Sequence, residues 1–153
     1  MRILLVTLTA LFFATPAQAQ TQFDPDTLVP ANVTGDARMV WRLLVSADYL
    51  IHLDRTLSVS DPVRIANFER SRIQCQAGLN YAAESMPGSK ALLDTCMGFA
   101  TIVLGDAAGC IRLRAAYPGL TEPAALSGIF ADLMPAYYQA ATQILTTGAC
   151  KDR

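Results

Sequence analysis

Side chains that hold metals, attach haem or exchange electrons are scarce in this sequence. It contains a single histidine, His52, and neither a C-x-x-C nor a C-x-x-C-H motif. Structural zinc sites use closely spaced cysteine and histidine ligands, and haem attachment uses the second motif. The G-x-S-x-G motif of serine hydrolases is also absent. We therefore expect no metal site, no cofactor and no catalytic residue, and we predict that the protein is not an enzyme.

An excess of basic charge is missing as well. The chain has 12 Lys and Arg against 13 Asp and Glu, and charged residues make up 16% of it. Binding to nucleic acid or to an anionic membrane surface requires a strongly basic face. We expect neither of these partners. Four carboxylates that a hydrolase could use in pairs fall on the solvated faces of predicted helices, where they are ordinary surface charges: Glu69, Glu84, Asp94 and Glu122.

No apolar run is long enough to cross a bilayer, which takes about 20 residues. The run at residues 3–14 follows Arg2 and precedes Ala-Gln-Ala at 17–19, the pattern of a signal peptide with its cleavage site. We predict a signal peptide over 1–19, followed by an exported protein, periplasmic or secreted. The remaining 134 residues are enough for one domain with a core.

Cysteines are few but even in number, and all lie after the predicted cleavage site: Cys75, Cys96, Cys110 and Cys150. Exported proteins fold in oxidising compartments, so we expect two disulfides. Four cysteines allow three pairings, and spacing alone does not choose among them.

Strand signals are also weak, whereas apolar residues recur at helical spacing. We predict an all-α, single-domain bundle of about four helices pinned by the two disulfides. Prolines and glycines between the periodic segments mark the breaks. The expected parts are a flexible lead over 20–35 and a helical domain over 36–153, with helices at about 36–57, 62–86, from 90, and from 121 to 147.

The stretch from Cys96 to Cys110, CMGFATIVLGDAAGC, contains three glycines within the third predicted helix. Its ten uncharged residues up to Gly105 suit a buried core helix rather than a membrane span. Glycines weaken a helix, so they need a structural reason. Close approach of another backbone is the favoured reason. A break at Gly105, with Asp106 capping a second short helix, is the alternative, and a ligand-contacting groove is a third.

Antiparallel packing about the predicted turn at residue 87 gives two pairings between the second and third helices. It places Cys75 and Cys96 at nearly equal height, which favours that disulfide and leaves Cys110 with Cys150 by elimination. The second bridge requires the C-terminus to fold back or the last helix to break at Pro135. The same geometry separates Arg72 from Asp106 by about 6 Å along the axis, at 1.5 Å per residue. We predict a buried ion pair between them that sets the helix register.

Four side chains around Pro135 are candidates for an apolar pocket: Phe130, Met134, Tyr137 and Tyr138. Core packing is the simpler interpretation of this group. His52 falls on the polar face of the first helix, where we expect a solvated side chain.

Exported helical domains with disulfides commonly act through a surface, so we expect a protein partner of unknown identity. A periplasmic small-ligand carrier is the alternative. The order Cys96-x-Gly-Phe, Gly105-Asp106, Cys110 and Cys150 resembles small periplasmic immunity proteins that neutralise secreted cell-wall amidases, over about half of the chain. The resemblance implies an inhibitor of a cell-wall hydrolase and assigns no residue a role.

Overall fold

A computed structural model describes residues 23–147 and 149–151, and every regular element in these residues is helical. The predicted signal peptide over 1–19 lies outside the described residues. The all-α class and both disulfides, Cys75–Cys96 and Cys110–Cys150, are confirmed. In chain order the elements are η1 (Pro25–Leu28), α1 (Gly35–His52), α2 (Pro62–Leu79), α3 (Ser89–Val103), α4 (Ala108–Ala116), η2 (Tyr117–Leu120), α5 (Pro123–Leu126), η3 (Ala131–Leu133) and α6 (Met134–Thr146).

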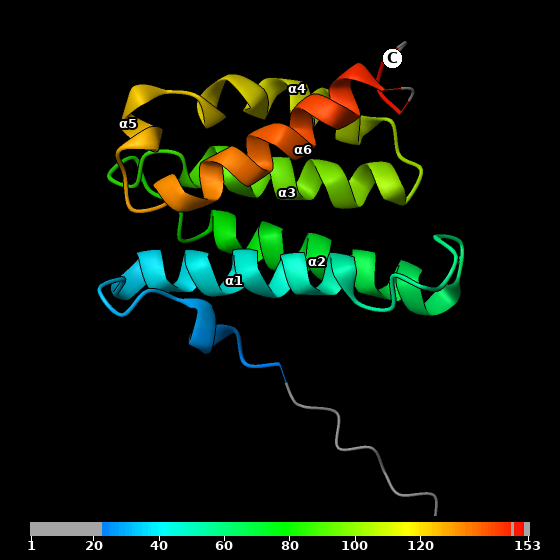
Figure 1. Ribbon diagram of the computed structural model, residues 1–153, viewed down its shortest axis with the longest axis horizontal. Coiled ribbons are helices and arrows are strands. Elements are labelled where there is room, and N and C mark those ends of the chain that lie inside the picture. Colours follow the sequence, from blue (N-terminus) through cyan, green and yellow to red (C-terminus); the bar gives the residue numbers. More distant parts are fainter. Residues whose placement is uncertain (1–22, 148, 152–153) are drawn as a thin grey trace, which may run out of the picture.

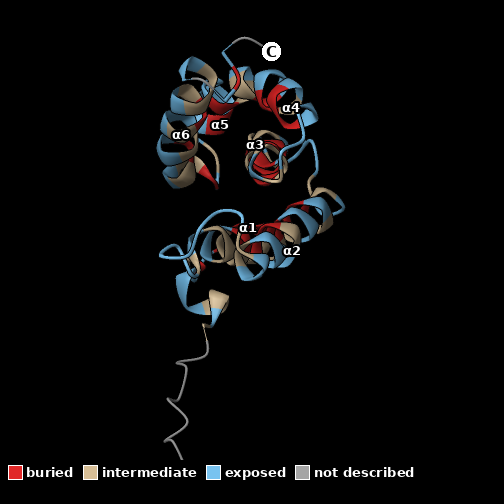
Figure 2. Ribbon diagram, turned by 90° about the vertical axis from the view of Figure 1, so that its right-hand side faces the viewer, coloured by how far each residue is buried: buried red, intermediate tan, exposed pale blue. Residues whose placement is uncertain are grey.

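The helices form layers around α3 (Figure 1). Helices α1 and α2 lie side by side at one face of the molecule, and α4 and α6 cover the opposite side of α3 (Figure 2). Buried residues lie mainly where these layers meet, and exposed residues cover the outer surfaces (Figure 2). Helix α3 is consequently surrounded on several sides, as its almost uncharged sequence predicts.

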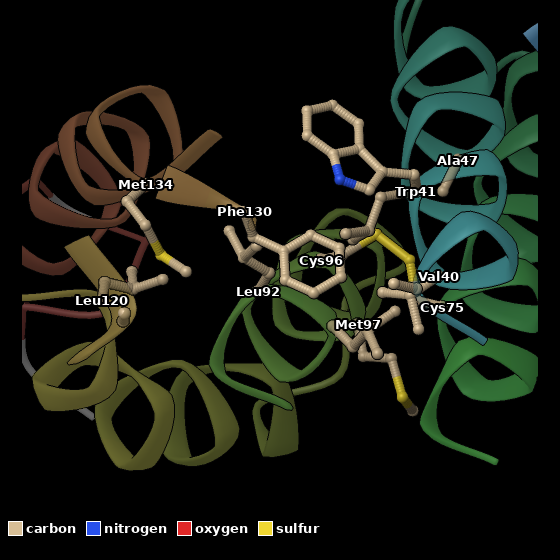
Figure 3. Packing of buried hydrophobic residues seen from close by; sticks show 14 of the residues in the cluster. Val40, Trp41, Ala47, Cys75, Leu92, Cys96, Met97, Leu120, Phe130 and Met134 are labelled. Atoms are coloured by element: carbon tan, nitrogen blue, oxygen red, sulfur yellow. A yellow bond between two sulfur atoms is a disulfide. The ribbon is translucent and has the colours of Figure 1, made fainter. Parts of the chain in front are cut away.

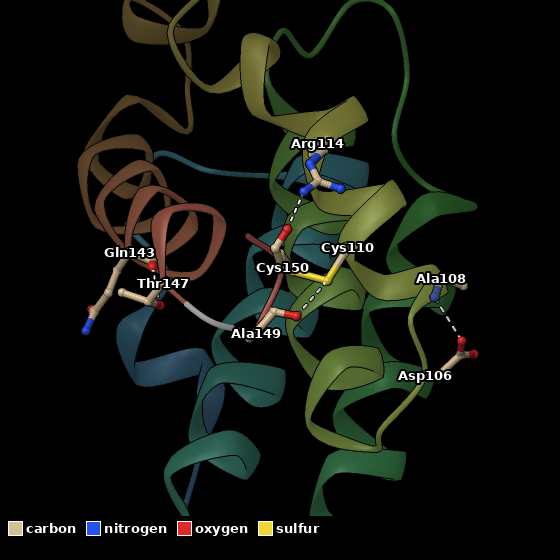
Figure 4. The surroundings of a disulfide bond; sticks show 8 residues. All are labelled: Asp106, Ala108, Cys110, Arg114, Gln143, Thr147, Ala149 and Cys150. Carbon is tan, nitrogen blue, oxygen red and sulfur yellow. Dashed lines mark hydrogen bonds between the residues drawn. A yellow bond between two sulfur atoms is a disulfide. The ribbon is translucent and has the colours of Figure 1, made fainter. Parts of the chain in front are cut away.

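The third predicted helix is split into α3 and α4, as the alternative of a break at Gly105 describes, while the favoured close approach of two backbones holds at the other two glycines. Gly105 adopts a left-handed conformation with φ of 87°, which glycine takes without steric cost. The Asp106 carboxylate then accepts a hydrogen bond of 2.9 Å from the Ala108 amide at the start of α4 (Figure 4). The other two glycines, Gly98 and Gly109, face each other where α4 folds back on α3.

The last predicted helix is also divided. Of the expected kink or break near Pro135, the structure shows a break: the chain forms α5, η3 and α6, and each α-helix has a proline in its first turn, Pro123 and Pro135. Proline is favoured there because its missing amide would have no helical partner. The break at Pro135 and the turn after Thr146 bring Cys150 back to Cys110.

Residues 23–34, within the predicted flexible lead over 20–35, pack against α1 in the structure. Val29 and Val33 are buried. Asp26 forms ion pairs of 2.8 Å with Arg38 and 3.1 Å with Arg42 on α1. This segment therefore adds both apolar contact and charge pairing to the first layer.

The core joins the two sides of the molecule through large side chains (Figure 3). Phe130, from the segment between α5 and η3, lies against Trp41 of α1 with their ring centroids 6.0 Å apart. The Cys75–Cys96 disulfide is fully buried beside them and joins α2 to α3. The α1–α2 layer is thus attached to the rest of the molecule by both a covalent bond and aromatic packing.

Candidate functional site

The predicted buried pair of Arg72 and Asp106 is wrong, because both residues are exposed. Arg72 binds Glu69 on its own helix at 2.7 Å. The buried side of α2 passes through Ser71 rather than its neighbour, which turns Arg72 outward. Asp106 lies in the α3–α4 turn, where it caps the Ala108 amide.

The interhelical ion pair of this region uses different residues. Asp94 of α3, whose exposed fraction is 8%, binds Arg112 of α4 at 2.6 Å and Lys90 at 2.5 Å. Sequence reasoning placed Asp94 on a solvated face because it did not favour α4 folding back across α3. The sequence offers one weak signal, an aspartate that directly precedes the long uncharged part of α3, and it does not identify the partner.

The four predicted pocket residues do not line one site. Phe130 and Met134 are fully buried in the core, as the simpler interpretation expected. Tyr138 is exposed and stacks on Tyr117 with centroids 5.0 Å apart. Tyr137 borders an apolar cleft, and the other three do not line it.

That cleft lies between α1 and α6 and has a volume of about 360 Å³. We call it the α1–α6 cleft. Its walls come from the start of the described chain, the C-terminal half of α1, and the η3–α6 junction. The lining residues are Phe23, Leu28, Leu44, Val45, Asp48, Tyr49, His52, Leu133, Ala136 and Tyr137.

The floor of the α1–α6 cleft is apolar, and its polar groups lie at the rim. Leu44 is buried and Val45, Leu133 and Tyr137 are half-buried, whereas Asp48 and His52 are exposed. This division exists because successive turns of α1 place Leu44 and Asp48 on the same face, one turn apart. A guest would therefore meet apolar surface inside and a charge at the opening.

The rim is organised by two short-range contacts. His52 Nδ1 donates a hydrogen bond of 2.9 Å to the Asp48 carbonyl oxygen and lies 3.6 Å from the Asp48 carboxylate. The Tyr49 ring stacks on the Phe23 ring with centroids 3.9 Å apart. His52 is exposed, as expected, but the sequence did not show that it borders a cleft.

Tyr137 connects the floor to the rim electrostatically. Burial raises the pKa of the Tyr137 hydroxyl above its ordinary value of 10.0, and the nearby Asp48 charge raises it further. The Asp48 carboxylate is thus close enough to the interior of the cleft to affect a group on the opposite helix.

A second hollow of about 340 Å³ lies beside Lys90, Asp94 and Glu122. Its central carboxylate, Asp94, already has two cationic partners. This hollow is therefore a solvated part of the α3–α4 ion-pair network rather than an open binding site.

The C-terminal end is fastened to α4 by more than the disulfide. The Arg114 guanidinium donates a hydrogen bond to the Cys150 carbonyl oxygen beside the Cys110–Cys150 bridge (Figure 4). These contacts hold the chain after α6 against the α4 face, away from the α1–α6 cleft.

Within residues 23–147 and 149–151, no helix combines the length and apolarity needed to cross a bilayer. The same residues include no cluster of three or more His, Cys, Asp or Glu side chains suited to a metal ion.

Compared with known proteins, the chain matches no family model, no curated protein and no solved structure. The resemblance to immunity proteins of cell-wall amidases therefore stays a prediction. A functional assignment has to rest on the geometry of the molecule, and the α1–α6 cleft is its most developed apolar opening.

Proposed function

We propose that the protein is an exported binding protein that recognises a protein partner through the α1–α6 cleft. The observation behind this proposal is an apolar cleft whose rim continues into exposed apolar surface. Leu28, 58% exposed, and the exposed ring of Tyr49 border the opening. Exposed apolar surface beside a cleft is typical of sites that bind another molecule.

The open rim favours a protein over an enclosed small ligand. Pockets for small molecules bury most of the ligand surface. One side of this cleft is open, because Asp48, Tyr49 and His52 are exposed there. A bound group can therefore stay attached to a larger molecule outside the cleft. A side chain projecting from a partner's surface meets this requirement.

Binding is also a better fit to the lining than catalysis. The described residues that line the cleft include no serine, threonine or cysteine nucleophile. His52 Nδ1 is occupied by a carbonyl oxygen of its own helix. An inhibitor of a cell-wall hydrolase is one form that such a binding protein takes.

The proposed location outside the cytoplasm is supported by the disulfides and by the N-terminal sequence pattern. Two disulfides indicate an oxidising compartment. With the signal-peptide pattern at residues 1–19, this supports export to the periplasm or the medium.

A small-ligand carrier is the second candidate, because the cleft volume of about 360 Å³ falls in the range of small-molecule pockets, roughly 300–1,000 Å³. Native mass spectrometry of the exported protein separates the two candidates. A fixed non-peptide mass supports the carrier, a bound polypeptide supports partner binding, and a bare chain argues against the carrier.

The direct test places a photo-crosslinking amino acid at Leu28, beside the cleft, and as a matched control at Ile111, which is 69% exposed on α4. We expect a polypeptide adduct from position 28 and none from position 111. Ala136→Trp, which fills the cleft from an exposed position, should abolish the adduct and weaken binding of the purified partner at least tenfold. An adduct that persists in Ala136→Trp would contradict the proposal.

A further inference from the structure

The chemistry of the α1–α6 cleft also indicates what kind of partner side chain it takes. We propose that the cleft accepts a lysine or arginine side chain of the partner, with its aliphatic stem on the floor and its cationic head at Asp48. This inference rests on the proposed function, because it specifies the group that the partner presents.

The floor suits the stem of a basic side chain. Leu44, Leu133 and Tyr137 supply apolar surface inside the cleft. The methylene stems of lysine and arginine pack on such surface while the charged head stays in water, which gains apolar burial without desolvating the charge.

The rim provides a carboxylate for the head group. The Asp48 side chain is 60% exposed, and among the described residues its one nearby cationic group is His52, 3.6 Å away and charged only when protonated. Asp26, in the segment that packs on α1, is by contrast already paired with Arg38 and Arg42. Asp48 is therefore available to an incoming cation.

Aromatic rings stand beside this carboxylate. Tyr49, the next residue along α1, stacks on Phe23, and both rings line the cleft. The face of an aromatic ring attracts ammonium and guanidinium groups within about 6 Å. A carboxylate next to aromatic rings selects for a cation and against an anion.

Other charges near the opening do not cancel this preference. Asp54 and Arg55 both line the adjacent hollow, which shares Tyr49 and His52 with the cleft, and their formal charges offset each other. Asp48 is the one carboxylate among the described residues that line the cleft. A fatty acid or another carboxylate ligand would meet repulsion at the rim.

The test uses four probes with the same alkyl chain: hexylammonium, hexylguanidinium, hexanol and hexanoate. Each is titrated into the oxidised, exported protein at low salt and neutral pH, and NMR shifts of the Val45 and Leu133 methyl groups are followed. We expect both cations to bind about three- to fivefold more tightly than hexanol, and hexanoate more weakly, as an exposed ion pair provides.

Asp48→Asn should remove the preference for cations and leave hexanol binding unchanged. Asp36→Asn, at the other end of α1 and outside the cleft, is the matched control and should keep the preference. Equal binding of hexanoate and hexylammonium, or a cation preference that survives in Asp48→Asn, would overturn the inference. If hexanol still bound in that case, the apolar cleft and the proposed function would stand.

Two further outcomes have distinct meanings. If no probe shifts the cleft methyl groups and position 28 yields no adduct, both the inference and the proposed function are overturned. If native mass spectrometry finds a small amine bound to the exported protein, the occupant of the cleft is a free cation. The inference that the cation is a side chain of a partner protein is then overturned.

Discussion

Two glycines, Gly98 and Gly109, determine how closely α3 and α4 approach each other. A Cβ atom at position 109 would lie 2.7 Å from the Gly98 carbonyl oxygen and 2.8 Å from the Ile102 amide nitrogen. Real Cβ atoms do not come so near to backbone atoms, so any side chain at this position forces the helices apart.

Gly109→Ala should therefore lower the free energy of unfolding by about 1–3 kcal/mol, the usual cost of overpacking. Gly105→Ala is the comparison, because a Cβ there meets nothing within 4 Å and is opposed only by φ of 87°. We expect Gly105→Ala to cost about 1 kcal/mol. Urea unfolding measures both, and a smaller loss for Gly109→Ala than for Gly105→Ala would contradict the close-approach argument.

Arg112, paired with buried Asp94, and Arg72, paired with exposed Glu69, provide a second comparison at the scale of residues. Arg112→Met leaves Asp94, which is almost fully buried, with only exposed Lys90, and should cost about 1–3 kcal/mol of stability. Arg72→Met breaks only the exposed pair with Glu69 and should cost less than about 0.5 kcal/mol. Thermal unfolding of the two variants would refute this assignment if their losses matched.

At the scale of elements, two breaks determine the topology. The turn at Gly105 folds α4 back onto α3, and the proline at the start of α6 redirects the last helix. Each break makes possible a contact that a straight helix prevents: Asp94 with Arg112 in the first case, and Cys110 with Cys150 in the second.

Removal of each disulfide tests how much these long-range links contribute. The bridges span 21 and 40 residues of sequence, so the chain-entropy account gives about 3 and about 4 kcal/mol respectively. We expect Cys75→Ala with Cys96→Ala, and Cys110→Ala with Cys150→Ala, to lose these amounts in urea unfolding. A loss below about 1 kcal/mol for either pair would show that the reduced chain is already held by packing.

At the scale of the whole molecule, the α1–α6 cleft is a space that the packed helices leave between α1 and α6. The segment before α1, α1 itself and α6 contribute its walls, and these parts are far apart in the sequence. Burial raises the pKa of Tyr137 inside this cleft, so pH provides a test of the assembled structure.

The sign of the pH effect follows from proton linkage. Above the ordinary tyrosine pKa of 10.0, the unfolded chain releases the Tyr137 proton while the folded protein retains it. The contribution of Tyr137 to the free energy of unfolding is therefore fully present below pH 10 and is lost as the pH rises further. The stability of Tyr137→Phe should fall less steeply than that of the wild type between about pH 10 and 12 in thermal unfolding, and identical slopes would contradict the raised pKa of this hydroxyl.

The helical class, the single histidine, the cysteine count and the favoured Cys75–Cys96 bridge were determined by the sequence itself. Periodicity of apolar residues is local information, and an antiparallel pair around a proline turn has only one simple register. Gly105 and Pro135 also marked possible breaks in the sequence. The sequence did not show whether the helix continues or ends at Gly105, or whether it kinks or breaks at Pro135.

Tertiary structure alone decided the Asp94–Arg112 pair, the failure of Arg72 to meet Asp106, and the α1–α6 cleft. Whether α2 buries Ser71 or Arg72 depends on a helix rotation of one residue, which packing against α1 and α3 selects. The cleft joins Asp48 to Tyr137, residues 89 positions apart that no periodicity relates. Such contacts depend on the balance of all the packed layers, so no local stretch of this chain contains them.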